Sequence, residues 1–166
     1  IAEQLKVSAT PVREAFRKLA KDNLVVIVPW KGVTVKADTP EEIVALYQCR
    51  EVMEGLGARL CARHATPEQV EELKELCREM HAIEDATARV EVNSRFHSMI
   101  AQFSGNERVV DYLLDFRERV NRDMYLSSFN AVRTHDCDDE HDHIVDAIER
   151  HDEVAAENAM RQHINN

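Results

Sequence analysis

Four polar side chains that fall on apolar helical patterns could together hold a metal ion. Asn93 and His97 are four residues apart, which places them only about 40° apart around a helix, so their side chains can converge. His141 and His163 fall on the apolar sides of two later helical patterns. Three imidazoles and one amide oxygen from three helices suit a first-row divalent ion. Spacing alone leaves a second interpretation open, because a chain with eight histidines can align three by chance and a half-buried histidine is commonly a hydrogen-bonded core residue.

Arg50 is a second candidate for chemistry, one helical turn after Tyr47 in the segment YQCR. A guanidinium that points into a helical bundle needs an anion. The residues alone favour an ion pair with Glu54 at position i+4, and the carboxylate of a bound ligand is the alternative. A later helix carries three arginines that could add a second anion clamp, although most of them should be solvated: Arg117, Arg119 and Arg122.

The start of the chain has the pattern of a helix-turn-helix. Thr10 can cap a helix whose first residue is Pro11, because the fixed φ of proline suits the first turn. Before it, residues 1–5 form a short apolar helical face and residues 6–8 form a turn. The helix after the turn has one apolar face, made of Val12, Ala15, Phe16 and Leu19.

A β-hairpin should follow this helix. The segment LVVIVPWKGVTV, residues 24–35, consists of two β-branched runs joined by a proline–glycine turn. A hairpin behind a helix-turn-helix is a wing, so the pattern predicts a winged helix-turn-helix that binds DNA. Cations near a helix N-terminus suit phosphates and base edges. The predicted DNA-binding residues are Thr10, Arg13 and Arg17 on the helix and Lys31 and Gly32 in the wing.

The rest of the chain predicts helices and no further strand. Capping residues followed by proline begin two of the helices, at residues 39–40 and 66–67. About six helices are expected, at residues 40–63, 67–84, 89–103, 107–127, 136–150 and 153–164. The predicted fold class is mostly α. A winged helix-turn-helix that is N-terminally incomplete (residues 1–36) precedes an all-α antiparallel bundle of about six helices (residues 37–166).

The distribution of charge separates the same two segments. Residues 1–36 contain seven lysines and arginines against three acidic residues, a balance of +4, whereas the remainder contains fourteen against twenty-eight, a balance of −14. Only the first segment suits DNA, because the second would be repelled by a polyanion. Four isolated cysteines suggest buried apolar residues in a reducing compartment. With no apolar run that could span a bilayer and no signal peptide, we expect a soluble cytoplasmic protein with no membrane partner.

These motifs resemble those of a known family. The run SATPVREAFRKLAKDNLV followed by a basic-glycine wing resembles the GntR family of bacterial transcription regulators. The segments YQCREVMEGLGARLCA, NSRFHSMIAQFSGN and EHDHIVDAIERHDEVAAENAMRQHI resemble the FCD ligand-binding domain of its FadR-type branch. Two positions depart from the family pattern. Ala9 stands where arginine is common, which removes a DNA contact, and Asn93 stands where the family's D-x-x-F-H motif has aspartate.

The resemblance implies the roles of the site residues. Asn93, His97, His141 and His163 match positions that commonly hold a metal in this family, which implies a divalent ion: zinc first, with nickel or manganese as alternatives. Tyr47 and Arg50 match a Tyr-x-x-Arg pattern, which implies that they bind the carboxylate of a small organic acid effector. The neutral amide of Asn93 should weaken metal binding and make an effector carboxylate a more attractive ligand.

The resemblance therefore implies a homodimeric, ligand-responsive regulator that binds a palindromic DNA operator, more often as a repressor, and that is not an enzyme. Two alternatives remain. A metal-dependent helical-bundle enzyme would need a general base, for which Glu140 is the only candidate adjacent in sequence to His141. A metal sensor would need no organic effector. In the regulator hypothesis, the ligand must favour one arrangement of the DNA-binding domains over another.

Overall fold

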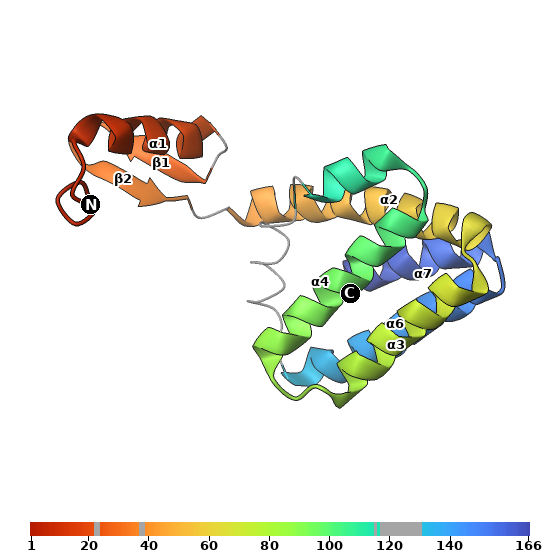
Figure 1. The fold of residues 1–166 in the computed structure, drawn as a ribbon. Helices are drawn as coiled ribbons and strands as arrows, with labels where there is room; N and C mark the ends of the chain where they lie inside the picture. Colours follow the sequence, from red (N-terminus) through yellow and green to blue (C-terminus); the bar gives the residue numbers. More distant parts are fainter. Residues whose placement is uncertain (22–23, 37–38, 115, 117–130) are drawn as a thin grey trace. The chain divides into compact units, whose positions relative to one another are not determined.

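The structure, a computed structural model, describes residues 1–21, 24–36, 39–114, 116 and 131–166; of Val35 and residues 131–138 it describes the backbone alone. The chain divides into two compact units, Ile1–Ile43 and Val44–Asn166. The first unit contains a helix, a two-stranded hairpin and the start of a second helix, and the second unit is a group of packed helices (Figure 1). The predicted class, mostly α with a wing after an N-terminal helix-turn-helix, is confirmed.

The first unit is built around helix α1 (Ala9–Lys21), which packs against strand β1 (Val25–Val28). The helix begins two residues before Pro11, so the expected cap Thr10 lies inside its first turn. Proline is tolerated there because the first four N–H groups of a helix have no intrahelical acceptor. Val12 and Phe16 are half-buried on its inner side, as the apolar pattern predicted. Both Ala15 and Leu19 of the same pattern are exposed.

Residues 1–7 form one helical turn that ends sharply. Leu5 N–H donates to the Ile1 carbonyl (2.9 Å), Val7 N–H to Ala2 (3.1 Å) and Lys6 N–H to Glu3 (3.2 Å). These bonds and the φ of 54° at Lys6 are those of a Schellman motif, in which a left-handed residue closes a helix. The expected helix over residues 1–5 is thus a single closing turn. It ends where the sequence placed the corner of the helix-turn-helix.

Strand β1 pairs with β2 (Gly32–Val35) in an antiparallel hairpin, with Val25 opposite Val35 and Val28 opposite Gly32. At its tip, Lys31 N–H donates to the Val28 carbonyl (3.1 Å), and Trp30 has a φ of 65°. This is the hydrogen bond and backbone of a type II turn, whose third position normally needs glycine or asparagine. Trp30 is fully exposed at this strained position, and no contact among the described residues of the unit explains its presence.

The helical unit contains α2 (Pro40–His64), α3 (Pro67–Ala82), α4 (Ala86–Phe103), α6 (Ala131–Glu149) and α7 (Glu153–Asn165), and residues 107–114 are also helical. Helix α6 packs against α7 and α3, and α3 also packs against α4. The expected helices are thus present in order among the described residues, and the part of the expected 107–127 helix beyond residue 116 lies outside them. The three arginines proposed as a second anion clamp, at positions 117, 119 and 122, lie outside the described residues.

Capping residues explain where most of these helices begin. Thr39 and Glu42 exchange side-chain to backbone hydrogen bonds of 3.0 and 3.2 Å at the start of α2, and Thr66 and Gln69 form a capping box at the start of α3. Helix α4 begins three residues earlier than predicted because the Asp85 side chain accepts a hydrogen bond from Ala88 N–H (2.8 Å). Helix α6 begins at Ala131, five residues earlier than predicted.

The core lies between these helices. Its largest fully buried side chains come from α3, α4, residues 107–114, α6 and α7: Leu73, Met80, Phe96, Ile100, Val109, Ile144, Ile148 and Met160. Helix α2 adds the smaller Cys61. The two glycines of α2 permit close packing. A Cβ on Gly57 would lie 3.3 Å from Val109, and one on Gly55 would lie 2.8 Å from the Arg161 side chain. Cys61 and Cys77 are buried and Cys49 is exposed; burial raises the pKa of Cys61 to about 12, which keeps its thiol protonated.

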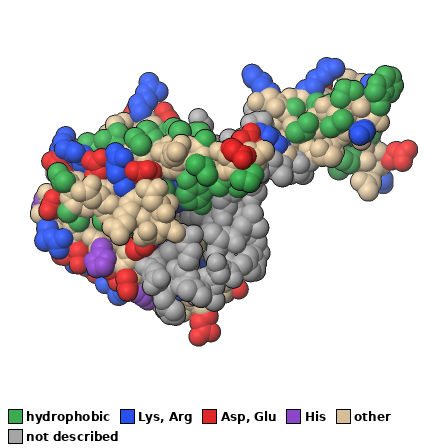
Figure 2. Space-filling model, turned by 180° about the vertical axis from the view of Figure 1, so that it is seen from behind, with side chains coloured by type: hydrophobic (Ala, Val, Ile, Leu, Met, Phe, Trp, Pro, Cys, Tyr) green, Lys and Arg blue, Asp and Glu red, His purple; other side chains and the backbone are tan. Residues whose placement is uncertain are grey.

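The surface of the helical unit mixes both signs of charge. Figure 2 shows Lys and Arg side chains interspersed with Asp and Glu over the face in view. Cross-helix ion pairs contribute to this pattern, including Arg63 with Glu153 (2.7 Å) and Lys74 with Glu149 (2.7 Å). None of the helices in the described ranges is both long and apolar enough to cross a membrane.

Candidate functional site

Three histidines from three helices converge inside the helical unit. His97 lies on α4, His141 on α6 and His163 on α7, and each offers a ring nitrogen within 4.8 Å of those of the other two. The Nε2 atoms of His97 and His163 are 3.3 Å apart. The ring of His141 lies 4.4 Å from that of His163 and 5.8 Å from that of His97, centroid to centroid. Helical spacing brings these side chains together because each faces the core of the bundle.

The site is shielded from water. His97 and His141 are buried, at 7% and 2% exposure, and His141 packs edge-on against Phe96. Burial lowers the pKa of His97, although the carboxylate of Glu54 opposes the effect, and burial lowers the pKa of His141 well below its ordinary value. Neither ring nitrogen of His141 has a hydrogen-bond partner in the part of the chain that the structure describes. His141 is therefore a neutral imidazole whose lone pair is available to a ligand.

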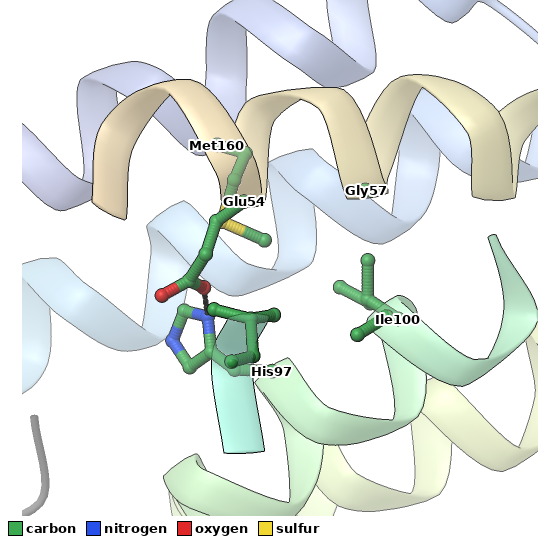
Figure 3. A pocket seen from close by; sticks show the side chains of 7 residues that line it. Glu54, Gly57, His97, Ile100 and Met160 are labelled. Atoms are coloured by element: carbon green, nitrogen blue, oxygen red, sulfur yellow. Dashed lines mark ion pairs between the residues drawn. The ribbon is translucent and has the colours of Figure 1, made fainter. Parts of the chain in front are cut away.

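Glu54 of α2 connects Arg50 to the histidines. Its Oε1 accepts a hydrogen bond from Arg50 Nε (2.6 Å), and its Oε2 lies against Nδ1 of His97, a contact that is an ion pair only when the imidazole is protonated. Figure 3 shows this carboxylate pointing from α2 towards the imidazole of α4. Burial would by itself raise the pKa of Glu54, but Arg50 and His97 outweigh that effect and hold its pKa well below the ordinary range. The buried Arg50 thus has the ion pair that the residues alone favoured, and its Cζ lies 5.4 Å from the ring centre of Tyr47.

A second carboxylate holds the third histidine. Glu140 of α6 contacts Nδ1 of His163 through Oε2 (2.8 Å), and its Oε1 accepts a hydrogen bond from the side-chain amide of Asn166 (2.6 Å). Sequence reasoning considered Glu140 only as a general base next to His141. The structure instead places it against His163, 23 residues away. The signal that could have found it is that both residues lie on the core-facing sides of adjacent helices.

Asn93 lies one turn before His97 on α4, and its side-chain oxygen is buried. The remaining histidines whose side chains are described lie apart from the site. His64 and His143 are exposed, His81 pairs with Asp142 (2.9 Å), and His151 contacts the Ala62 carbonyl through Nδ1 (2.8 Å). The side chain of the histidine at position 135 lies outside the described residues.

A small pocket adjoins the histidines. It is lined by Glu54, Gly57, His97, Ile100, Ala101, Leu113 and Met160. Most of these residues are apolar, and the two polar ones, Glu54 and His97, form the ion pair that Figure 3 marks with a dashed line. Its side chains fill it in this structure, so a ligand could enter only if some of them moved.

The five residues predicted to bind DNA are all exposed on the first unit. Thr10, Arg13 and Arg17 lie on α1, and Lys31 and Gly32 lie at the tip of the hairpin. Gly32 has a φ of 101°, a conformation that side chains other than glycine rarely adopt. These cations are therefore available to a polyanion.

Comparison with known proteins agrees with this architecture. Residues 1–35 match the gntR family of bacterial regulatory proteins, and residues 45–166 match the FCD domain. The HTH-type transcriptional repressor RspR of Escherichia coli K12 is 28% identical over 99% of this chain and 73% of its own length. The HTH-type transcriptional repressor NanR of Enterobacter sp. strain 638 is 30% identical over 99% of this chain and 72% of its own length.

Solved structures show the same fold. E. coli McbR/YncC superposes with a TM-score of 0.76 at 20% identity, and a transcriptional regulator GntR from Rhodococcus sp. RHA1 superposes with a TM-score of 0.72 at 28% identity. Each match covers 99% of this chain and 80% of the other. The protein is a DNA-binding transcription regulator with a helical C-terminal domain. It belongs to the GntR family of bacterial regulatory proteins, with an FCD domain. The family and these relatives are transcription regulators, which rules against the enzyme hypothesis.

Proposed function

We propose that this regulator is a homodimeric repressor that acts in the cytoplasm on a palindromic operator, and that its helical domain binds a divalent metal ion together with a small organic acid. The repressor role is supported by the two repressors among its relatives. An organic acid would act by binding better to one arrangement of the two DNA-binding domains than to another, since equal affinity would shift no equilibrium.

The metal proposal rests on one observation, the 3.3 Å separation between Nε2 of His97 and Nε2 of His163. Two nitrogen ligands of a tetrahedral zinc ion with bonds of about 2.0–2.1 Å lie about 3.3–3.4 Å apart. The buried His141, which has no hydrogen-bond partner among the described residues, supplies a third nitrogen. The side chains present therefore fit a zinc ion. When bound, the ion would supply a Lewis-acidic position for an effector carboxylate, and Asn93 would be its fourth protein ligand.

The proposed effector site combines this centre with Arg50. Because Arg50 already pairs with Glu54, an effector carboxylate has to join or replace an existing ion pair rather than neutralise a bare guanidinium. The remainder of a small acid would lie against the apolar residues of the adjoining pocket, whose side chains would have to move apart to admit it. Tyr47 would fix the guanidinium from its other side.

Calorimetric titration of chelator-treated protein with Zn²⁺, Ni²⁺ and Mn²⁺ tests the metal proposal. We expect one ion per chain, loss of binding in His97→Ala, and tighter binding in Asn93→Asp, because aspartate restores an anionic ligand. His143→Ala is the matched control, since His143 is exposed on the same helix as His141 and should leave binding unchanged. Full stoichiometric binding by His97→Ala would show that the ion lies elsewhere.

One observation favours a second candidate, a metal sensor without an organic effector. The charge of Arg50 is already balanced by Glu54, so the pocket does not require an external anion. Titrating operator binding with metal alone separates the two functions. A full response to the metal with no further change on adding organic acids would establish the sensor.

A further inference from the structure

Two carboxylates contact the outer nitrogens of the histidines in a matched way. Oε2 of Glu54 contacts Nδ1 of His97, and Oε2 of Glu140 contacts Nδ1 of His163 at 2.8 Å. The other two nitrogens, both Nε2, face each other at 3.3 Å. Thus each of these imidazoles has a carboxylate on one side and the other imidazole on its opposite side.

This arrangement determines where the protons lie. An ionised carboxylate can only accept a hydrogen bond, so Nδ1 of each ring must carry the proton. In a neutral imidazole the other nitrogen, Nε2, then has a free lone pair. Two lone pairs facing each other at 3.3 Å repel, and a cation placed between them would turn that repulsion into two attractive contacts.

We propose that Glu54 and Glu140 are positioning residues of the metal centre: each holds one histidine through Nδ1 and thereby directs its Nε2 to the ion. This inference rests on the proposed metal function and extends it beyond the ligands themselves. Carboxylates that orient metal-binding histidines fix the ring and its tautomer and increase the basicity of the ligand nitrogen.

Each carboxylate is itself fixed by a second partner. Glu54 uses its other oxygen to accept from Arg50 (2.6 Å), and Glu140 uses its other oxygen to accept from Asn166 (2.6 Å). The contacts therefore connect α2 to α4 and α6 to α7. His141 differs, since neither of its nitrogens has a hydrogen-bond partner in the described ranges, and its ring is held by packing against Phe96 instead.

The tautomers provide a test that needs no metal. Long-range ¹⁵N–¹H spectra of ¹⁵N-histidine-labelled, chelator-treated protein, recorded at pH 8, distinguish Nδ1–H from Nε2–H imidazoles. We expect His97 and His163 to be Nδ1–H, with assignments from single histidine variants. An Nε2–H tautomer at either residue would overturn the inference whatever the outcome of the metal titrations.

Variants provide the second test. Glu140→Gln keeps the shape of the side chain but loses its charge, and we expect the Kd for Zn²⁺, measured by competition with a chelator, to rise by about 10- to 100-fold. Glu149→Gln is the matched control: it removes the same charge from the same helix, where Glu149 contacts Lys74 and no histidine. An unchanged Kd in Glu140→Gln would contradict a positioning role.

Glu54 requires a paired variant because Glu54→Gln alone would leave Arg50 buried without its counterion. The double variant Arg50→Met/Glu54→Gln removes both charges together, and we expect the same rise in Kd and, at His97, a mixture of tautomers. A double variant that folds, binds zinc with the Kd of the unmodified protein and keeps a pure Nδ1–H tautomer at His97 would exclude Glu54. If the unmodified protein binds no metal, the proposed metal function fails. The tautomer spectra would still decide whether the two carboxylates fix the tautomers of His97 and His163.

Discussion

His141 places two polar nitrogens in the core, and neither has a hydrogen-bond partner in the described part of the chain. A buried polar group left without a partner costs about 1–3 kcal/mol of folding free energy. The ring is otherwise accommodated like an apolar side chain, packed on Phe96 at 4.7 Å between ring centres. The metal-free protein therefore bears an energetic penalty at this residue that a bound ion would remove.

Replacing the ring with a hydrocarbon tests this account. We expect His141→Leu to stabilise the metal-free protein by about 1–3 kcal/mol, because it removes the unsatisfied nitrogens while filling a similar volume. The same variant should lose the additional stability that zinc gives to the unmodified protein. Denaturant unfolding with zinc and with a chelator measures both effects. Destabilisation of the metal-free form would show that the nitrogens of His141 are satisfied in solution.

Acidification should destabilise the metal-free protein. The pKa values of His97 and His141 are lowered in the folded state, whereas histidines of the unfolded chain titrate near pH 6.5, at about the ordinary value. Below pH 6.5 the unfolded state therefore binds protons that the folded state does not. The free energy of unfolding of the metal-free protein should thus decrease as the pH is lowered.

Urea unfolding in chelator between pH 7.5 and 5.5 measures this loss. The loss of stability should be smaller in His141→Leu than in the unmodified protein. It should be the same as in the unmodified protein in His143→Gln, whose imidazole is exposed. If the free energy of unfolding depended equally on pH in the unmodified protein and in both variants, the fold would not hold the buried imidazoles neutral.

The sequence predicted the histidines of this centre better than their carboxylates. His97, His141 and His163 could be identified because helical periodicity places each on a core-facing side and because the motifs resemble a family pattern. Glu54 could be predicted only as the i+4 partner of Arg50. Its contact with His97 joins two helices, and pairings between helices depend on packing angles that one-dimensional spacing does not contain.

At the scale of single elements, local signals determined most helix starts. Thr39 and Thr66 were identified as caps because a proline and a glutamate or glutamine follow each of them. Asp85 was missed because no proline follows it, although its side chain caps α4 in the same way. The Schellman turn at Lys6 could not be predicted from propensity, since lysine rarely adopts a positive φ. The conformation of this turn depends on hydrogen bonds between residues before and after it, which the propensity of Lys6 does not reveal.

Helix α1 and the wing yield a prediction about DNA. An operator selected from a random pool should bind with a steep dependence on salt, and Arg13→Ala should weaken binding by about 1–3 kcal/mol, because Arg13 is exposed on the predicted reading helix. Fluorescence anisotropy at two salt concentrations measures the effect. Arg150→Ala, which removes the same charge from the exposed end of α6, should have no effect. Equal affinities of the two variants would exclude Arg13 from the interface.

At the scale of the whole molecule, charge separates two functions along the chain. The basic winged segment suits a polyanion, whereas the acidic helical segment does not, so only the former should contact DNA. The helical unit instead contains the buried centre and its pocket. A regulator with this division must transmit ligand binding as a change in the free energy of DNA binding, and such a coupling is reciprocal.

The reciprocal coupling between effector binding and operator binding can be measured without knowing how the two units move. Calorimetry of zinc-loaded protein with small dicarboxylates, hydroxy acids and sugar acids should identify an effector whose affinity changes on adding operator. The operator's affinity should change by the same factor, expected at about 1–3 kcal/mol. Arg50→Ala should keep operator binding and lose the effector. An effector that binds Arg50→Ala as tightly as the unmodified protein would place its pocket elsewhere.

The unsatisfied ring of His141 also bears on how much of this regulator a cell retains. Proteases act on the small population of unfolded molecules, and a change of about 1–2 kcal/mol in stability can alter the abundance of a protein several-fold. If zinc occupies the centre, metal-starved cells would degrade the apo form faster than the loaded form. The concentration of the repressor would then follow metal supply even on operators whose occupancy responds only to the organic acid.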